Sequence, residues 1–436
     1  MSTRTHRILR RFLIVVGAIA ALIVAIGGLP SFLWATARPL HPVPQDVPSA
    51  VQAPPSPQWV AAVTRARQVV RAVLAEQNLP GLSVAVGVGG DIVWAEGFGW
   101  ADVQTHAPVT PQTRFRMGTA STALTAAAVG VLLEQDRVRL DEEIQAYVPQ
   151  FPKQPWPVTL RQLMGHVSGV GIADTDDWRL SSERCERAAD ALPVLADSPL
   201  LFQPGTQFRP SPRGWVLVSA AVEAAAARPF PSFMRDQVFE PLGMVNTGAE
   251  SPTEENPEHT GEDAEDPPPF KAIHDIIIEP WRVVAGTEAK SEAEGSTRPA
   301  PLYVPEFGPS PVYRYALRVA ALRNLSCYAG SMAFFSTPSD LVRFELGMRG
   351  SRLLRPATVQ SLEAFGRTAG GYDGELVGVR GLFDGELPGV TIMSVTTVRE
   401  PGIVVVTMSN STSADTSALA RKVGDAFTGS STAGHR

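Results

Sequence analysis

The feature that most constrains this chain is an uncharged, apolar stretch near its N-terminus, over residues 12–37. Four arginines lie among the eleven residues before it. About 20 consecutive apolar residues are enough for a helix that spans a bilayer, and positive charge before such a helix favours a cytoplasmic N-terminus. We therefore predict a single-pass membrane anchor over residues 1–37, with the bulk of the protein extracytoplasmic.

Two alternatives remain open for this segment. Residues 35–37 read Ala-Thr-Ala, the small-x-small form at which signal peptides are cleaved. Signal peptides usually have an apolar region of only about 7–15 residues, which favours an uncleaved anchor here. Arginine-rich N-termini can also direct a chain to an organelle. We expect the inner membrane of a bacterium, with the domain facing the periplasm.

The chain after the anchor divides into parts by composition. Residues 38–57 contain seven prolines, which predicts an extended, stiff tether that holds the domain away from the membrane. Residues 58–428 form the expected folded domain. It is interrupted over about 250–300 by an acidic, polar insertion that cannot bury enough apolar surface to order itself. A docking site is the alternative for that insertion, and residues 429–436 are expected to be a flexible tail.

Composition excludes some classes of function. The formal net charge of −6 argues against nucleic acid as a partner. The seven histidines are dispersed and the two cysteines, Cys185 and Cys327, have no metal-binding spacing, so we expect no metal and no cofactor. A disulfide between the two cysteines is one alternative, but separate thiols buried in the core are the prediction.

Hydrophobic periodicity predicts an α+β fold. A first helix is followed by a hairpin expected around Gly89-Gly90, then a helical middle, then strands and a last helix. The predicted helices are 59–76, 122–135, 216–227 and 418–426, and the predicted strands are 82–88, 92–97, 390–398 and 403–409. Strands near both ends of the domain should complete one antiparallel sheet.

Five segments, in order, resemble the serine β-lactamase-like family, which includes penicillin-binding proteins, class C β-lactamases, D-aminopeptidases, esterases and a LACTB-like branch. They are residues 79–86, 113–118, 160–169, 239–244 and 335–341. The resemblance covers about residues 60–425. It implies a β-lactamase/transpeptidase-like fold, with an antiparallel sheet flanked by helices and an all-helical region.

The resemblance also places the catalytic motifs, and each of them is altered. Thr119 stands where the family has its nucleophilic serine and Thr122 where it has the lysine base, with Ser121 between them. Pro210 and Pro212, on either side of Ser211, occupy the positions of the Tyr-x-Asn motif. Arg380-Gly381 is the nearest match to the third motif, which lacks its usual histidine or lysine. The chain has four lysines and none completes a Ser-x-x-Lys sequence.

The residues therefore favour a catalytically inactive binding or scaffolding protein, with a peptide or cell-wall-type ligand implied by the family. A serine/threonine hydrolase that uses Thr119 or Ser121 is the alternative, and a mainly structural protein that self-associates is a third. His166 and Ser168 are interpreted as structural, because Ser168 lies one place too late for a G-x-S-x-G elbow.

Overall fold

The computed structural model describes residues 15–17, 39–171, 180, 183–196, 199–250, 299–300, 303–305, 317–319, 324–363, 382–387, 390–398, 402–411 and 413–431. Within these ranges no helix has the length and apolar character needed to cross a bilayer. The predicted anchor lies outside them except for residues 15–17, as does almost all of the acidic insertion.

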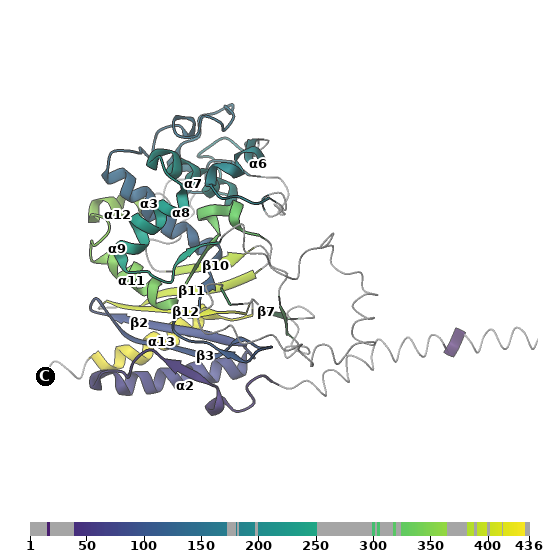
Figure 1. Cartoon of the computed structure of the whole chain (residues 1–436), viewed down its shortest axis with the longest axis vertical. Coiled ribbons are helices and arrows are strands. Elements are labelled where there is room, and N and C mark those ends of the chain that lie inside the picture. Colours follow the sequence, from purple (N-terminus) through teal and green to yellow (C-terminus); the bar gives the residue numbers. More distant parts are fainter. Residues whose placement is uncertain are drawn as a thin grey trace, which may run out of the picture.

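One antiparallel sheet organises the fold (Figure 1). Its strands follow the spatial order β1-β3-β2-β12-β11-β10, and β4 pairs with the far end of β3. The bounds are β1 Ser49–Val51, β2 Gly81–Val88, β3 Asp91–Asp102, β4 Ala107–Pro108, β10 Leu382–Leu387, β11 Val390–Val398 and β12 Ile403–Ser409. Because β2 pairs with β12, the two ends of the domain meet in the middle of the sheet, as predicted.

Strands β2 and β12, at the centre of the sheet, are buried on both faces. Successive residues of a strand point to opposite sides, and Val84 and Val86 of β2 join one core while Ala85 joins the other. Helices α2 (Val60–Glu76) and α13 (Thr416–Ser431) cover the first face, and α11 (Pro338–Arg349) packs on the second (Figure 1).

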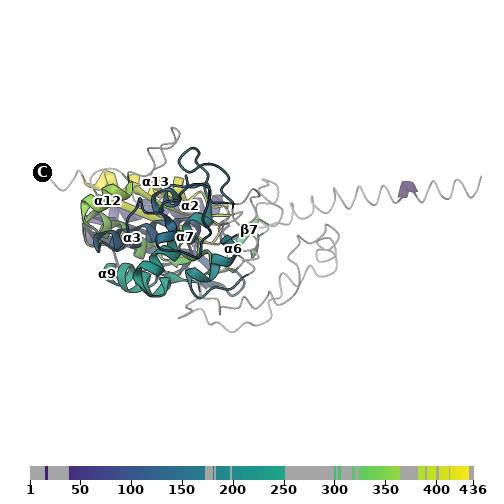
Figure 2. The same cartoon turned by 90° about the horizontal axis from the view of Figure 1, so that it is seen from above.

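A helical region lies on the α11 side of the sheet (Figure 1). Its centre is α3 (Ser121–Glu134), in which twelve of fourteen residues are buried, and α7 (Pro212–Ala226) packs beside it (Figure 2). Shorter helices surround the pair: α4 Leu160–Met164, α6 Leu192–Ala196, α8 Phe230–Met234, α9 Glu240–Leu242 and α12 Pro356–Glu363. Alanine is the commonest side chain along α3, which lets neighbouring elements approach it closely.

Two small sheets complete the described structure. The first, β5 (Phe115–Arg116), β9 (Phe334–Ser336) and β6 (Gly248–Ala249), links the segment before α3 to the segment before α11. The second pairs β7 (Tyr303–Pro305) with β8 (Leu317–Val319).

Three sequence-based predictions are corrected here. The segment predicted as a tether is bound to the domain: the Leu40 amide donates to Asn78 Oδ1 at 2.7 Å, Val47 is in the core, and β1 pairs with β3. Proline is compatible with an edge strand when it lies outside the hydrogen-bonded positions. Helix α13 continues to Ser431, into the predicted tail. Cys185 and Cys327 form a disulfide and are not separate thiols.

Candidate functional site

The predicted nucleophile region has the backbone frame expected of it. Strand β5 leads into a short 3-10 turn, η3 (Gly118–Ala120), and α3 follows directly. Gly118 has φ 56°, a conformation that glycine adopts without strain. The Met117 amide donates to the Phe334 carbonyl at 2.9 Å, and η3 packs against the edge strand β10. Thr119 therefore lies partly exposed at the start of a buried helix, beside the edge of the main sheet.

The hydroxyl groups next to Thr119 are engaged in structural hydrogen bonds. Thr122 is almost buried, and its hydroxyl donates to the Thr119 carbonyl at 2.8 Å. Ser121 is fully buried, and its Oγ accepts the Phe334 amide at 3.3 Å. A substrate in a surface cleft could not reach Ser121 without unpacking α3 from β9. Of the three hydroxyls predicted for this site, Thr119 alone is in a position to meet a ligand.

The second predicted motif forms the entry to α7. Pro210 is exposed, Ser211 is the residue before the helix, and Pro212 is its first residue. Proline suits that position because its fixed φ is helical and its missing amide is not needed there. Neither proline has a group that can move a proton, so this segment can shape a surface but cannot support acid–base catalysis.

His166 holds the α7 entry in place. Its Nδ1 faces the Ser211 amide at 3.2 Å and its Nε2 faces the Trp215 indole N–H at 3.2 Å. Both neighbours are donors, so a second ring proton would point at another N–H group. Burial lowers the pKa of His166 from its ordinary value of 6.5 to about 4, in agreement with that arrangement. The structural interpretation of His166 is confirmed, and Ser168 is likewise a turn residue that accepts the Val170 amide.

A buried clamp, not expected from the sequence, joins α3 and α7 to η7 (Ser326–Ser331). The Gly330 carbonyl accepts the Thr125 hydroxyl at 2.8 Å, and the Gly330 amide donates to Ser219 Oγ at 3.1 Å. An added Cβ on Gly330 would lie 2.1 Å from Thr125 Oγ1, so only glycine fits. Because η7 leads through Met332 and Ala333 into β9, the clamp also fixes the strand whose amide binds Ser121.

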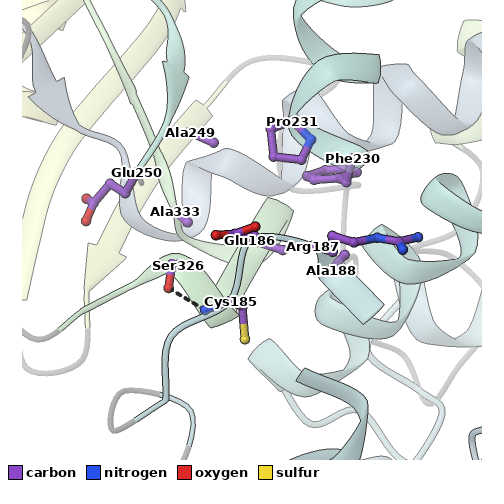
Figure 3. A pocket seen from close by; sticks show the side chains of 11 residues that line it. Cys185, Glu186, Arg187, Ala188, Phe230, Pro231, Ala249, Glu250, Ser326 and Ala333 are labelled. Atoms are coloured by element: carbon purple, nitrogen blue, oxygen red, sulfur yellow. Dashed lines mark hydrogen bonds between the residues drawn. The ribbon is translucent and has the colours of Figure 1, made fainter. Parts of the chain in front are cut away.

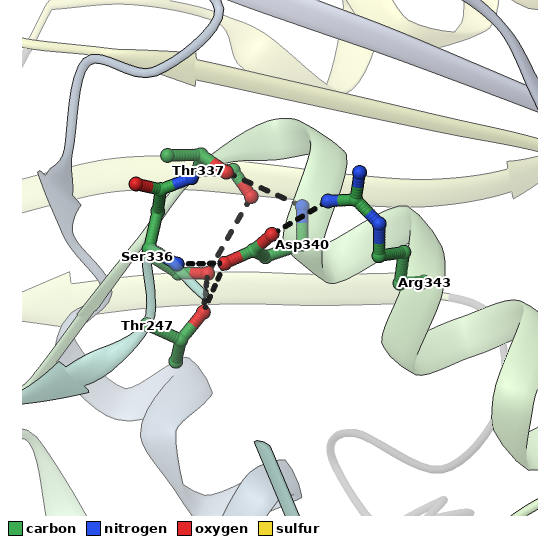
Figure 4. A network of polar contacts seen from close by, with 6 residues as sticks. Thr247, Ser336, Thr337, Asp340 and Arg343 are labelled. Atoms are coloured by element: carbon green, nitrogen blue, oxygen red, sulfur yellow. Dashed lines mark hydrogen bonds and ion pairs between the residues drawn. The ribbon is translucent and has the colours of Figure 1, made fainter. Parts of the chain in front are cut away.

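A second buried network anchors the other end of β9 (Figure 4). Asp340 is fully buried and accepts the Asn246 amide at 2.7 Å, the Thr247 hydroxyl at 3.0 Å and Arg343 Nη1 at 2.7 Å. Desolvation by burial raises the pKa of the Asp340 carboxyl, although each of these contacts opposes the rise. The resemblance marked this segment, but only the fold reveals its partners.

A cavity of about 270 Å³ lies beside the disulfide, lined by Phe230, Glu250 and Ala333 among others. Figure 3 shows Ser326 across from Cys185, whose amide donates to Ser326 Oγ at 3.0 Å. Glu250 also forms an ion pair with Arg116, three residues before Thr119. None of the predicted site residues that the structure describes lines this cavity. Disulfides are typical of extracytoplasmic proteins, so the predicted location was the signal that could have favoured the pairing.

Arg380 and Gly381, predicted for the third motif, lie outside the described residues. Of the other predicted positions, Thr119, Ser121 and Thr122 are brought together at the start of α3. Pro210, Ser211 and Pro212 lie at the start of the neighbouring helix α7, which packs against α3.

Comparisons with known proteins agree with this architecture. The family model described as Beta-lactamase matches residues 66–428. The mitochondrial serine beta-lactamase-like protein LACTB of Homo sapiens is 26% identical over an alignment of 264 residues, and the match covers 45% of this chain and 48% of that protein. Penicillin-binding protein 4* of Bacillus subtilis is 26% identical over 185 residues, 41% of this chain and 40% of the relative. The chain thus spans about half the length of the curated relatives it matches.

Solved structures show the same fold. FmtA from Staphylococcus aureus aligns with a TM-score of 0.59 and 16% identity, covering 84% of this chain and 89% of FmtA. The D-amino acid amidase from Ochrobactrum anthropi SV3 aligns with a TM-score of 0.60 and 19% identity, covering 85% of this chain and 99% of the amidase. At these identities the likeness concerns the fold alone.

Proposed function

This chain belongs to the β-lactamase family, and we propose that it is a catalytically inactive member that binds a ligand instead of turning one over. The other parts of the proposal are that residues 1–37 anchor it in a bacterial inner membrane and that the domain faces the periplasm. The basic, apolar N-terminal sequence supports the anchor.

One observation carries the proposal: the hydroxyl of Thr122 donates to the carbonyl of Thr119. A serine or threonine hydroxyl is a weak nucleophile at neutral pH unless a nearby base takes its proton. The resemblance puts that base one helical turn after residue 119. At this place the chain has a side chain that cannot accept a proton at neutral pH and whose own hydrogen already has an acceptor.

The proton shuttle is missing as well, because prolines stand at positions 210 and 212. Removing one member of a cooperating catalytic set typically costs a factor of about 10⁴–10⁶ in rate. Backbone oxyanion donors and binding alone leave perhaps a factor of about 10³ over water. With nucleophile type, base and shuttle all changed, turnover would fall far below that of a working hydrolase.

The surface around Thr119 remains suited to binding. Thr119 is partly exposed, and it lies beside the edge strand β10. An edge strand offers unpaired amides and carbonyls to an extended peptide. Among the relatives, one is named a penicillin-binding protein and one a D-amino acid amidase. We therefore propose a peptide or cell-wall-type ligand for the surface around Thr119.

A second candidate, a hydrolase that attacks through Thr119, is favoured by the partial exposure of that residue. The burial of Ser121 argues against the same role for Ser121. The two candidates differ in whether Thr119 becomes acylated.

Labelling with a fluorophosphonate and with a fluorescent penicillin tests the proposal. The full-length protein in detergent should give no more label than the Thr119→Ala variant, with an active β-lactamase as the positive control for the probes. Label in the natural protein that disappears in Thr119→Ala, but persists in Ser168→Ala, would refute inactivity and establish the hydrolase.

A further inference from the structure

The first described residues after the predicted anchor are already part of the domain. The Leu40 amide donates to Asn78 Oδ1, the loop residue after α2, at 2.7 Å. His41 is 5% exposed and its Nε2 lies 3.3 Å from the Pro80 carbonyl. Val47 is buried in the core under α2, and β1 follows it into the sheet. The chain is thus fixed to the domain from residue 40 onwards.

This attachment limits how far the domain can stand from a bilayer. Leu40 is three positions after Ala37, the end of the apolar stretch, and three extended residues span at most about 10 Å. The headgroup layer on each side of a bilayer is roughly 5–8 Å thick. A free tether over residues 38–57 would have reached about 60 Å at polyproline spacing. If the hydrocarbon core ends at Ala37, the attachment at Leu40 puts the domain surface near Leu40 at the headgroups.

The chemistry of that surface suits a membrane. Among the described residues after 39, five large hydrophobic side chains are exposed, and three of them lie close together in the sequence: Val43 at 45%, Val51 at 40% and Val60 at 48%. The adjoining helix α2 has three arginines and one glutamate; Arg67 is ion-paired with Glu96, while Arg65 donates to the Ala426 carbonyl and Arg71 to Ser49 Oγ. The exposed apolar side chains, and not an excess of positive charge, are therefore what suits this surface to the headgroup layer.

We propose that residues 43–60 and the start of α2, here called the N-terminal face, dock on the headgroup layer of the membrane in which residues 12–37 are embedded. The proposal rests on the membrane anchoring proposed above. In this orientation α2 lies on the membrane side of the sheet, and α3 and α7 lie on the opposite side (Figure 1). The surface around Thr119 is then held at a fixed height above the bilayer, whereas a long tether would let that height vary.

Site-directed fluorescence on the full chain tests this orientation. The two native cysteines are paired, so an introduced cysteine is the only free thiol. Variants Val43→Cys, Val51→Cys and Val60→Cys carry an environment-sensitive dye, and Val245→Cys is the matched control because Val245 is 77% exposed and lies beyond α9. Each protein is placed in vesicles of phosphatidylcholine and phosphatidylglycerol that contain a headgroup spin-labelled lipid as quencher.

We expect the lipid quencher to reduce the fluorescence at positions 43, 51 and 60 and to leave position 245 unchanged. Equal fluorescence at all four positions, in protein that floats with the vesicles, would overturn the docking surface while the anchor stands. Dyes that are shielded from water but insensitive to the lipid quencher would indicate a second copy or another protein as the occupant, and would also overturn it. Protein that fails to float with the vesicles would refute the anchor, and the docking surface with it.

Discussion

Replacing Thr125 by valine should loosen the clamp that holds α3 against η7. The Thr125 hydroxyl donates to the Gly330 carbonyl at 2.8 Å and lies 3.2 Å from the Ser121 carbonyl, and the side chain is fully buried. Valine keeps the shape of the side chain but removes the donor. The buried carbonyl of Gly330 then loses this hydrogen bond, which typically costs about 1–3 kcal/mol.

The geometry puts the expected cost in the upper half of that range. A methyl carbon needs about 3.3 Å or more from a carbonyl oxygen, whereas the oxygen it replaces lies at 2.8 Å. Helix α3 and η7 would have to separate by about half an ångström. We therefore expect Thr125→Val to lower the free energy of unfolding by about 2–3 kcal/mol.

Two variants separate the hydrogen bond from general effects of the substitution. Thr64→Val makes the same change at an exposed position of α2, where the hydroxyl donates only to the carbonyl four residues earlier, at 2.8 Å; it should change stability by less than about 0.5 kcal/mol. Thr125→Ser keeps the donor and loses one methyl group, which should cost about 1 kcal/mol.

Urea unfolding of the full-length protein in detergent, followed by tryptophan fluorescence, measures these differences. With a slope near 3 kcal/mol per molar urea, the midpoint of Thr125→Val should fall by roughly 0.7–1 M. The reasoning is wrong if Thr125→Val unfolds at the same urea concentration as Thr64→Val, or if Thr125→Ser is as unstable as Thr125→Val.

Two further predictions concern the disulfide and His166. The disulfide closes a loop of 142 residues, so the Cys185→Ser/Cys327→Ser double variant should lose up to about 5 kcal/mol of stability by the chain-entropy relation; unfolding midpoints that match those of the natural protein would contradict this. Because the folded pKa of His166 is about 4 and the ordinary value is 6.5, the unfolded chain takes up a proton first as pH falls, so stability should drop between pH 6.5 and 4 and level off below. In His166→Gln the free energy of unfolding should fall by about 1–3 kcal/mol less between pH 6.5 and 4 than in the natural protein. An equal fall in both proteins would refute the lowered pKa of His166.

Local pattern was enough to predict most of the regular elements. Strands β11 and β12 have the predicted bounds. In β12, Val404 and Val406 join one core and Ile403 and Val405 join the other, so both faces of this central strand must be apolar. The strongly apolar sequence over residues 122–135 predicts helix α3. Helix α7 begins four residues before the prediction, because Pro212 is compatible with the first position of a helix even though it ends most helical patterns.

Contacts between distant residues account for what the sequence could not predict. Thr125 and Gly330 are 205 residues apart, and the Asn246 amide reaches Asp340 across 94 residues. Neither pair has a local signature, since each depends on how separate elements pack. The N-terminal segment was misassigned for the same reason. Its prolines predict extended backbone, whereas Pro44–Asp46 and Pro57–Trp59 are short 3-10 helices, and only the fold shows that Asn78 and β3 bind the segment.

The residue that is stable at position 122 depends on the residues at positions 210 and 212. Thr122 is 5% exposed, and a lysine in its place would bring a charged amine to a nearly buried position. Such a charge is stable only with a hydrogen-bonding or ionised partner. The resemblance would supply that partner from the tyrosine and asparagine at positions 210 and 212, where this chain has prolines. Once those groups are gone, threonine is the more stable residue at 122, because it makes its hydrogen bond within its own turn. We therefore expect Thr122→Lys alone to destabilise the start of α3. Under the proposal of an inactive site, a working base would need the Tyr-x-Asn groups at 210 and 212 together with the lysine.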